Sequence, residues 1–428
     1  MKAARMRRIK VLVIAESANP EWVSVPLVGW SMANALRTVA DVHIVTQVRN
    51  RDAIVRAGLV EGREFTAIDT ERIAAPAYKI AQLLRGGKGK GWTLVTAIST
   101  LIYPFFERQI WRQFGVAIKQ GDYDLVHRIT PLSPTTPSPL ASKCHKAGVP
   151  FILGPLNGGL PWPAGFNSDR RKEREWLSYV RRLYRILPNR IATLKAANVI
   201  IAGSRHTAAE IPTRFAAKTT YMPENGIDPT RFAQVAHLAD GKVMRLCFIG
   251  RLVPYKGPDM ALRAALPLLR DKRAHFDVIG NGPMEDELRA LVAAEGIEDA
   301  VTFHGWVAHD RLQEIATASQ VFVFPSVREF GGGAVLEAMA MGLVPVVVDY
   351  GGPGELVAAG GGIAVPLASR VEIVASVQAA LLELEGDAER ALSISVSVRA
   401  WVLDKMTWSA KAKQMLTIYE SVVASSAR

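Results

Sequence analysis

Residues 326–342 read S-V-R-E-F-G-G-G-A-V-L-E-A-M-A-M-G, and this stretch is the most informative one in the second half of the chain. The apolar segment 321–324 precedes it and the apolar segment 334–341 closes it, so we expect a strand, a glycine-rich turn and a helix. Such a turn leaves backbone N–H groups free and points a helix N-terminus at a ligand, which suits phosphate. A carboxylate is costly to bury without a partner, so Glu337 in this apolar helix should meet a ligand or a polar partner in the core.

Length and composition indicate two folded domains. A chain of 428 residues fits two domains of roughly 200 residues each. An apolar content of 49% and a charged content of 21% are typical of a globular protein and not of a disordered one. The two cysteines, Cys144 and Cys247, lie far apart without ligand partners at metal spacing. This argues against a disulfide framework or a zinc site and favours a reducing, cytoplasmic location.

Neither a secretory signal nor a membrane span is expected. The apolar run 11–15 that follows the basic residues 1–10 is too short for a signal peptide, and it predicts a first strand. The nearest candidate for a span, residues 92–106, contains fifteen uncharged residues, among them Ser, Thr and Pro. Because a span needs about 20 apolar residues, this segment predicts a buried or interfacial helix.

The positive charge is concentrated in the first half of the chain. Residues 1–230 contain 33 Lys and Arg against 17 Asp and Glu, a net charge of +16, whereas residues 231–428 have a net charge of −4. The densest basic stretch, 169–190, is interleaved with Trp, Tyr and Leu. This pattern suits an anionic membrane surface or a phosphorylated acceptor, and the alternative is a solvated helix face. No nucleic-acid motif accompanies the charge, so a nucleic-acid partner is not expected.

Short β-rich runs alternate with helical stretches along both halves, which predicts an α/β fold with two doubly wound parallel sheets. The turn-rich segment 223–229 precedes a polar stretch, so the domain boundary is expected there. The expected strands are 10–15, 42–48, 125–129, 150–154, 199–202 and 219–222 in the first half, and 244–249, 275–279, 301–304, 321–324, 345–348 and 363–365 in the second.

A second constellation of site residues follows the strand 244–249. Arg251 and Lys256 supply two cations on one strand-to-helix loop, next to a glycine that permits close approach. Paired cations beside a helix N-terminus form a clamp for pyrophosphate. The loop around Gly280 either cradles a ring or phosphate or is an ordinary turn. Loops after parallel strands gather at the carboxyl edge of the sheet, where open α/β sheets bind ligands.

In the first half, His127 lies near the carboxyl end of an expected strand. It either contacts substrate or is a structural histidine with satisfied nitrogens. The loop 154–159 also follows a strand and is a candidate lining of the cleft. Asp122 and Asp124 form a D-x-D sequence like that of metal-dependent sugar transferases, but their position just before a strand predicts a turn. We expect no metal ion there.

The spacing Glu329-x7-Glu337 followed by A-M-A-x-G, together with the upstream G-R-x4-K-G around Arg251 and Lys256, resembles the retaining glycosyltransferases of family 4 (glycosyltransferase group 1). The resemblance is close over residues 223–420 and includes N-G-x-D at 225–228 and Thr407-Trp408. It implies the GT-B fold, in which two doubly wound, Rossmann-like domains face each other across a cleft. The domains expected are 1–228 on the acceptor side, 229–405 for the nucleotide sugar, and a C-terminal helix 406–428 that crosses back.

The resemblance also implies roles for individual residues. Arg251 and Lys256 would hold the donor's pyrophosphate, and Glu337 would accept hydrogen bonds from the nucleotide ribose. Glu329 would lie against the donor hexose, and His127 would approach the same sugar from the first domain. The backbone N–H groups of the turn would contact sugar hydroxyls and phosphate; they belong to Gly331, Gly332, Gly333 and Ala334.

The expected function is a hexosyltransferase that moves a hexose from a UDP-sugar or GDP-mannose to a lipid-linked or cell-surface polysaccharide acceptor. Retention at the anomeric carbon, no metal or other cofactor, and a peripheral position at the inner face of the membrane are expected with it. Two alternatives stay open: a synthase or phosphorylase of the same fold with a soluble acceptor, and a non-catalytic protein that binds sugar nucleotides. The donor sugar, its base, the acceptor and the linkage do not follow from the sequence.

Overall fold

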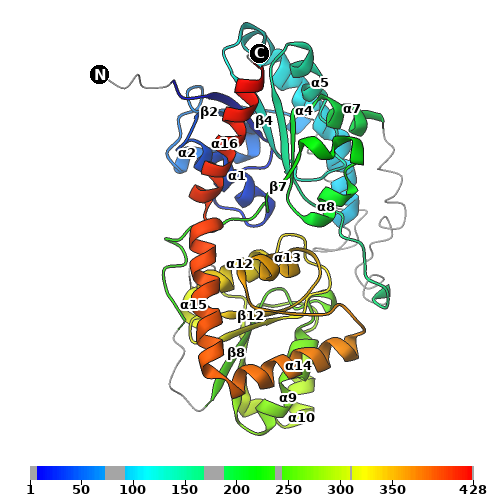
Figure 1. Cartoon of the computed structure of the whole chain (residues 1–428), viewed down its shortest axis with the longest axis vertical. Helices are drawn as coiled ribbons and strands as arrows, with labels where there is room; N and C mark the ends of the chain where they lie inside the picture. Colours follow the sequence, from blue (N-terminus) through cyan, green and yellow to red (C-terminus); the bar gives the residue numbers. More distant parts are fainter. Residues whose placement is uncertain (1–6, 73–91, 168–187, 237–242, 309–310, 427–428) are drawn as a thin grey trace. The chain divides into compact units, whose positions relative to one another are not determined.

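The computed structural model describes residues 7–72, 92–167, 188–236, 243–308 and 311–426 (Figure 1). The chain divides into two compact units. Unit 1 comprises Met1–Gly159, Arg170–Glu224 and Trp408–Arg428, and unit 2 comprises Leu160–Asp169 and Asn225–Thr407. The division lies within a few residues of the expected boundaries at 228 and 405, but the sequence did not indicate that Leu160–Asp169 groups with unit 2.

Unit 1 is built on a seven-stranded parallel sheet with the order β3-β2-β1-β4-β5-β6-β7. Most of the strand residues are apolar and buried because helices cover both faces of the sheet, although β2 and β4 also carry polar side chains. Their bounds are β1 Lys10–Ala15, β2 Asp41–Gln47, β3 Phe65–Ile68, β4 Leu125–Thr130, β5 Phe151–Leu156, β6 Val199–Ala202 and β7 Thr219–Tyr221. The helices are α1 Val25–Leu36, α2 Arg51–Arg56, α4 Trp92–Gln120, α5 Pro139–Lys146, α7 Pro188–Ala196, α8 Arg205–Glu210 and α16 Trp408–Ser426.

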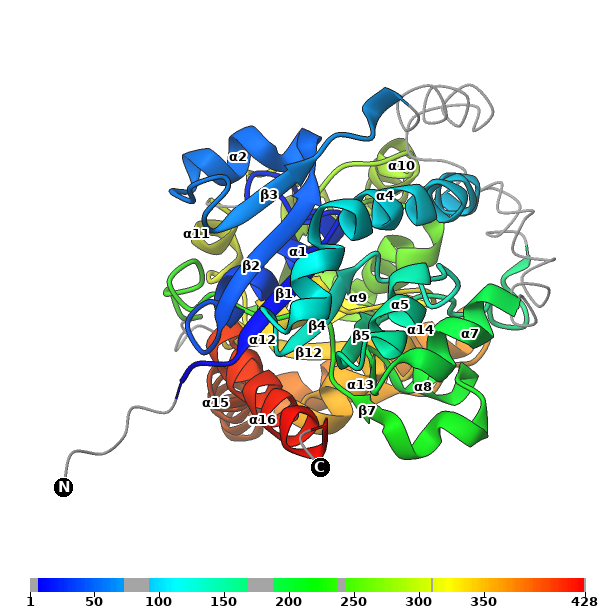
Figure 2. The same ribbon diagram turned by 90° about the horizontal axis from the view of Figure 1, so that it is seen from above.

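Side chains alternate along β1 between the two faces of this sheet. Leu12 and Ile14 pack with α4, α5 and α7, which Figure 2 shows on one side of the sheet. Val11 and Val13 pack with α1 and α16 on the other side. Helix α16 therefore completes the core of unit 1, although it follows unit 2 in the chain.

Unit 2 has a six-stranded parallel sheet with the order β10-β9-β8-β11-β12-β13 and one hydrophobic core. The strands are β8 Met244–Ile249, β9 Ala274–Ile279, β10 Val301–Gly305, β11 Val321–Phe324, β12 Val344–Val348 and β13 Ile363–Val365. The helices are α9 Pro258–Arg270, α10 Glu285–Glu295, α11 Leu312–Ala316, α12 Gly333–Ala340, α13 Gly351–Gly360, α14 Arg370–Gly386 and α15 Ala388–Lys405. In a doubly wound sheet the strand order reverses at a switch point, which here lies between β8 and β11.

The expected fold class is confirmed. All twelve expected strands are present, and their ends differ from the expected ones by at most two residues. The sequence missed β3, a four-residue edge strand. The expected buried or interfacial helix at 92–106 is the first half of α4, which continues to Gln120. Among the residues that the structure describes, no helix is both long and apolar enough to cross a membrane.

Candidate functional site

The candidate site in unit 2 is built from four loops at the carboxyl edge of its sheet. Backbone hydrogen bonds join the loops after β8 and β9: Gly250 N–H donates to Ile279 O at 2.9 Å, and Leu252 N–H to Asn281 O at 2.9 Å. Val327 N–H donates to Tyr255 O at 2.9 Å, which ties the loop after β11 to the loop after β8. The loops after β11 and β12 are joined by Gly352 N–H and Glu329 O at 3.1 Å. The four loops therefore form one connected platform at the switch point.

Two glycines let these loops approach one another. Gly280 has a φ of +134°, and a Cβ added there would lie 2.0 Å from the carbonyl oxygen of Gly250. Gly332 is left-handed, with a φ of +61°, and its Cβ would lie 2.8 Å from a methyl carbon of Leu356. Only glycine tolerates both the backbone conformation and the close contact. The expected role of Gly280 in cradling a ligand stays a prediction, because what the structure shows is loop packing.

Lys256 and Glu329 form an ion pair on this platform, with Nζ and Oε2 3.1 Å apart. Burial by itself would lower the pKa of Lys256, but the attraction of the Glu329 carboxylate and further groups outweighs it, so the pKa is raised. Arg251 lies close enough to oppose this rise by repulsion between like charges. The two cations from the loop after β8 therefore act on the same region, beside one carboxylate from the loop after β11.

Helix α12 points its amino end into the same region. Its N-cap is Gly332, so no side chain caps the first turn, and no acidic residue lies in that turn. The first N–H groups of a helix have no partner within the helix, and the helix dipole favours an anion near them. Asn225 fixes the turn before the helix, because its Nδ2 donates to Gly331 O at 2.9 Å. Gly331, Gly332, Gly333 and Ala334 are thus at the amino end of α12, where the sequence placed them.

Glu337 is half-buried one turn into α12. Burial raises its pKa to about 7, while Arg231 and Lys256 oppose the rise. The carboxyl group is therefore only partly ionised at neutral pH and changes its charge in the physiological range. Perturbed titrating groups of this kind cluster at functional sites. Arg231 was not singled out from the sequence, and its link to Glu337 arises only from the folding of unit 2.

Aromatic side chains from residues 160–167 cover part of the platform. The guanidinium carbon of Arg328 lies 4.8 Å from the ring centroid of Trp162 and 5.4 Å from that of Phe330. The Trp162 ring also meets Tyr255 edge to face, with ring centroids 6.0 Å apart. The hydroxyl of Tyr350 donates to Pro161 O at 2.8 Å. Sequence reasoning singled out the loop 154–159 but missed this neighbouring segment, whose signal was its sequence L-P-W-P-A-G-F.

His127 lies in unit 1 on β4 and is fully buried. Its Nε2 is 2.7 Å from Gly154 O, and its Nδ1 is 2.7 Å from the hydroxyl oxygen of Tyr419 on α16. Burial lowers the pKa of His127 to about 4, against the effect of the Gly154 carbonyl, so the ring is neutral. A carbonyl only accepts, so Nε2–H donates to it and Nδ1 accepts from Tyr419. These contacts match the structural alternative, and the catalytic role of His127 stays a prediction that they do not support.

The D-x-D sequence is a turn, as expected. The Asp124 carboxylate accepts from the backbone N–H of Lys10 at 2.7 Å and pairs with Arg7 at 2.7 Å. Its role is to hold the start of β1. Across the described ranges, no group of three or more His, Cys, Asp or Glu residues is arranged to hold a metal ion.

Residues 230–392 match the family described as Glycosyl transferases group 1. The chain is 32% identical over 238 residues to a GDP-mannose-dependent alpha-(1-6)-phosphatidylinositol monomannoside mannosyltransferase of Mycobacterium tuberculosis, covering 51% of this chain and 60% of that protein. It is 26% identical over 295 residues to a 2-deoxystreptamine glucosyltransferase of Streptomyces kanamyceticus, covering 64% of this chain and 74% of that protein. The chain thus spans about 60% of the length of the mycobacterial relative.

Solved structures share the fold of the whole chain. A glycosyltransferase from Rickettsia africae has a TM-score of 0.62 at 14% identity, covering 97% of this chain and 99% of that one. Anabaena HepE in complex with UDP and glucose has a TM-score of 0.58 at 15% identity, covering 97% of this chain and all of that one. These matches confirm a two-domain α/β fold of the GT-B type. The family match supports the predicted group 1 glycosyltransferase domain in unit 2, whereas the retaining mechanism and family 4 stay predictions.

Proposed function

We propose that the chain is a retaining, metal-independent glycosyltransferase that moves a hexose from a nucleotide-diphosphate sugar to an acceptor hydroxyl. The observation that carries this proposal is the Lys256–Glu329 pair beside the uncapped amino end of α12, at the switch point of the sheet. Cations, a carboxylate and a helix N-terminus meet there, which suits a ligand with both phosphate and sugar hydroxyl groups. The match of residues 230–392 to group 1 glycosyl transferases supports the same activity.

The reaction breaks the bond between the anomeric carbon and the diphosphate oxygen, and forms a bond from the anomeric carbon to the acceptor oxygen. The proton of the acceptor hydroxyl passes to the leaving diphosphate. Negative charge develops on the leaving diphosphate, and the sugar acquires oxocarbenium character. Arg251, Lys256 and the N–H groups of α12 would stabilise that charge, which a preorganised site does without reorganising during the reaction. When the diphosphate replaces Glu329 as the partner of Lys256, the Glu329 carboxylate is released toward the hexose.

The donor is a UDP-sugar or GDP-mannose in this proposal. The mycobacterial relative is named for GDP-mannose and for a phosphatidylinositol monomannoside, which favours GDP-mannose and a lipid-linked acceptor. Glu337, whose carboxyl group lies within electrostatic reach of Lys256, would accept hydrogen bonds from the ribose. The relative from Streptomyces kanamyceticus is named for 2-deoxystreptamine, and this observation favours the alternative of a small, soluble acceptor.

We place the protein at the inner face of a membrane, as a peripheral protein that acts on a lipid-linked or surface-polysaccharide acceptor. The net charge of +16 on residues 1–230 supports this, because anionic lipids attract basic surfaces. Both cysteines are free thiols, which fits a reducing compartment. The basic stretch 169–190, on which the membrane prediction first rested, falls almost entirely outside the described residues.

A donor screen tests the proposal. Binding and hydrolysis of UDP-glucose, UDP-galactose and GDP-mannose are measured for the wild type and for Lys256→Ala and Glu329→Ala. We expect one donor to be turned over, and each substitution to reduce kcat/KM by about 100-fold or more. Lys405→Ala is the matched control, because Lys405 pairs with Asp404 on the exposed surface of α15. Turnover that survives both site substitutions would refute the site, and donor binding without turnover would favour the non-catalytic alternative.

A further inference from the structure

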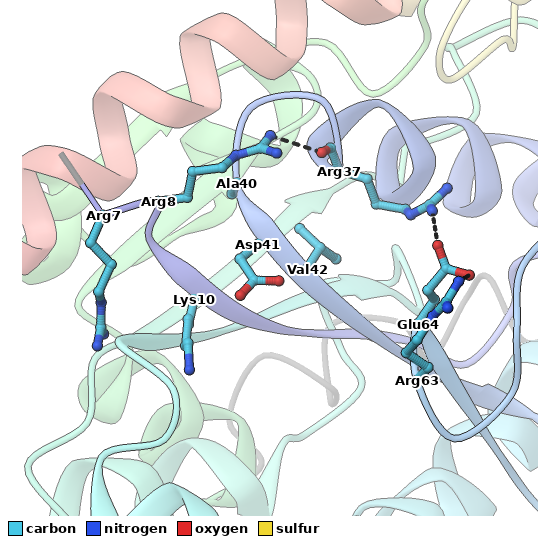
Figure 3. A pocket seen from close by; sticks show the side chains of 9 residues that line it. All are labelled: Arg7, Arg8, Lys10, Arg37, Ala40, Asp41, Val42, Arg63 and Glu64. Carbon is cyan, nitrogen blue, oxygen red and sulfur yellow. Dashed lines mark hydrogen bonds and ion pairs between the residues drawn. The ribbon is translucent and has the colours of Figure 1, made fainter. Parts of the chain in front are cut away.

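A basic pocket lies in unit 1 at the amino edge of its sheet. Open α/β sheets bind their ligands at the opposite, carboxyl edge. The pocket has a volume of about 390 Å³ and is formed where β1, β2 and β3 begin and α1 ends (Figure 3). Lys10 and Asp41 start β1 and β2 and are paired in register. Because β1 has six residues, the pocket is roughly 16 Å along the strand from its carboxyl end. Its lining residues are Arg7, Arg8, Lys10, Arg37, Ala40, Asp41, Val42, Arg63 and Glu64.

The lining carries five cationic side chains against two carboxylates, a net charge of +3. One carboxylate, Glu64, is already committed to other groups. It pairs with Arg37, lies 3.5 Å from Arg63, and accepts from the backbone N–H of Val60 at 2.9 Å. That N–H, with Arg37 and Arg63, lowers the pKa of Glu64 against the effect of burial, so its negative charge is permanent at neutral pH.

Arg8 and Lys10 together carry more positive charge than Asp41, the remaining lining carboxylate, can balance. Over the ranges the structure describes, neither side chain forms an ion pair, although Asp41 faces the same pocket. Figure 3 shows Arg8 reaching the backbone of Arg37, to whose carbonyl oxygen it donates at 2.9 Å. This bond holds the guanidinium in place and leaves its other N–H groups available. Like charges gathered in a concave surface raise the local potential and attract anions.

The guanidinium group of Arg37 is also held in a fixed position. It donates a hydrogen bond to Asn34 Oδ1 at 2.9 Å. It also forms an ion pair with Glu64, which Figure 3 shows. Arg7 is held in the same way by Asp124 at 2.7 Å. Arginine side chains fixed in this manner match the geometry of phosphate oxygens, and lysine adds a compact charge. A volume near 390 Å³ lies within the range of small-molecule sites and exceeds what one surface ion needs.

We infer that this pocket binds a phosphate-bearing group through Arg8 and Lys10, with Arg7 and Arg63 at its rim. The chemistry is that of a phosphate ester on a small polar body, supplied either by an anionic lipid headgroup or by a soluble phosphorylated molecule. The pocket belongs to unit 1 and does not include any residue of the candidate donor site. It is therefore independent of the proposed glycosyl transfer.

The test compares two pairs of substitutions that remove the same charges from unit 1. Arg8→Gln with Lys10→Gln changes the pocket, and Arg112→Gln with Lys146→Gln removes one exposed Arg and one exposed Lys elsewhere. Full-length proteins are titrated with vesicles of equimolar phosphatidylglycerol and phosphatidylcholine, and with vesicles of phosphatidylcholine alone. The same pairs in a Lys256→Ala background, which weakens the donor site, are titrated with inorganic phosphate and glycerol 1-phosphate.

A lipid source predicts that the pocket pair binds anionic vesicles about 30-fold more weakly than the wild type, with a much smaller change in the control pair. A soluble source predicts saturable binding of glycerol 1-phosphate that the pocket pair loses at least 10-fold and the control pair keeps. Equal effects of the two pairs in both titrations would overturn the inference, because only the net charge would then matter. If the pocket pair unfolds at a clearly lower temperature than the wild type, the single substitution Arg8→Gln at an exposed position is tested in its place. Its affinity for the same vesicles or phosphate ester is expected to be about 5-fold lower than that of the wild type.

Donor binding is measured with the same proteins. The pocket pair is expected to bind the nucleotide sugar as the wild type does, whatever the outcome of the phosphate titrations. A negative donor screen would therefore refute the donor site without bearing on the pocket. Negative phosphate and vesicle titrations would refute the pocket without bearing on the donor site.

Discussion

The imidazole of His127 and the phenol of Tyr419 form a buried hydrogen bond of 2.7 Å, although the two residues are 292 positions apart. The bond joins β4 to α16 across one face of the first sheet. The second ring nitrogen of His127 donates to Gly154 O, so the imidazole also connects β4 to the end of β5. The histidine that the sequence suggested as a contact to substrate is thus the central link among three elements of unit 1.

Tyr419→Phe should destabilise unit 1 by about 1–3 kcal/mol, because it leaves the buried Nδ1 of His127 without a donor. The aromatic ring remains, so packing changes little. Thermal unfolding followed by circular dichroism measures the effect, with Tyr221→Phe at an exposed position as the control. An unfolding temperature like that of the wild type would show that water or a rearranged neighbour satisfies the imidazole.

Glu337→Gln should change how stability depends on pH. Burial raises the pKa of Glu337 from 4.5 to about 7 in the folded state, so between these values the folded chain holds a proton that the unfolded chain has lost. The contribution of Glu337 to the free energy of unfolding therefore decreases as the pH rises from 4.5 to about 7. Glutamine does not titrate, so the variant lacks this decrease. The difference in unfolding free energy between the variant and the wild type should therefore shift in favour of the variant by about 2–3 kcal/mol from pH 5 to pH 8.

Urea unfolding at the two pH values measures this difference. Glu389→Gln, at an exposed position of α15, is the matched control and should shift stability equally at both pH values. The same offset at pH 5 and pH 8 for Glu337→Gln would mean that the carboxyl group titrates normally in the folded protein.

Gly280→Ala should disrupt the platform of loops in unit 2. The new methyl group would meet the carbonyl oxygen of Gly250 at 2.0 Å, and the φ of +134° is unfavourable for alanine. We expect a loss of more than about 3 kcal/mol, together with weaker donor binding. Gly386→Ala is the control, because nothing lies within 4 Å of its added Cβ. Wild-type stability of the Gly280 variant would mean that the two loops separate at little cost.

Removal of divalent cations should leave donor turnover unchanged. Arg251 and Lys256 supply the positive charge that would stabilise the leaving diphosphate, and Lys256 keeps its proton beside Glu329. Turnover is measured before and after dialysis against EDTA. A loss of activity that Mg²⁺ or Mn²⁺ restores would contradict the proposal of a metal-independent reaction.

Most of the fold could be predicted because parallel strands buried on both faces are nearly continuous apolar runs, as in β1 and β11. Strand β3 was missed because its two central residues, Thr66 and Ala67, are half-buried and give no continuous apolar run.

The candidate site was predictable where its residues follow one another along a strand, a turn and a helix, as Glu329 and the three following glycines do. Lys256 could be assigned to the same place because its loop follows the neighbouring strand β8. Trp162 and Arg231 could not, since only tertiary packing brings them to Arg328 and Glu337. His127 stayed ambiguous for a similar reason: nothing near it in the sequence shows that Tyr419 will cover it.

Helix α16, which closes one face of the first sheet, has a consequence for synthesis on the ribosome. Unit 1 begins the chain, yet Met415, Tyr419 and Val422 of its core are translated only after all of unit 2. Until then this face of the nascent sheet has α1 but lacks α16, so the apolar side chains that α16 covers remain accessible to chaperones. The core of unit 2 is translated without such an interruption after Asn225, so the second domain of the chain is the first that can finish folding.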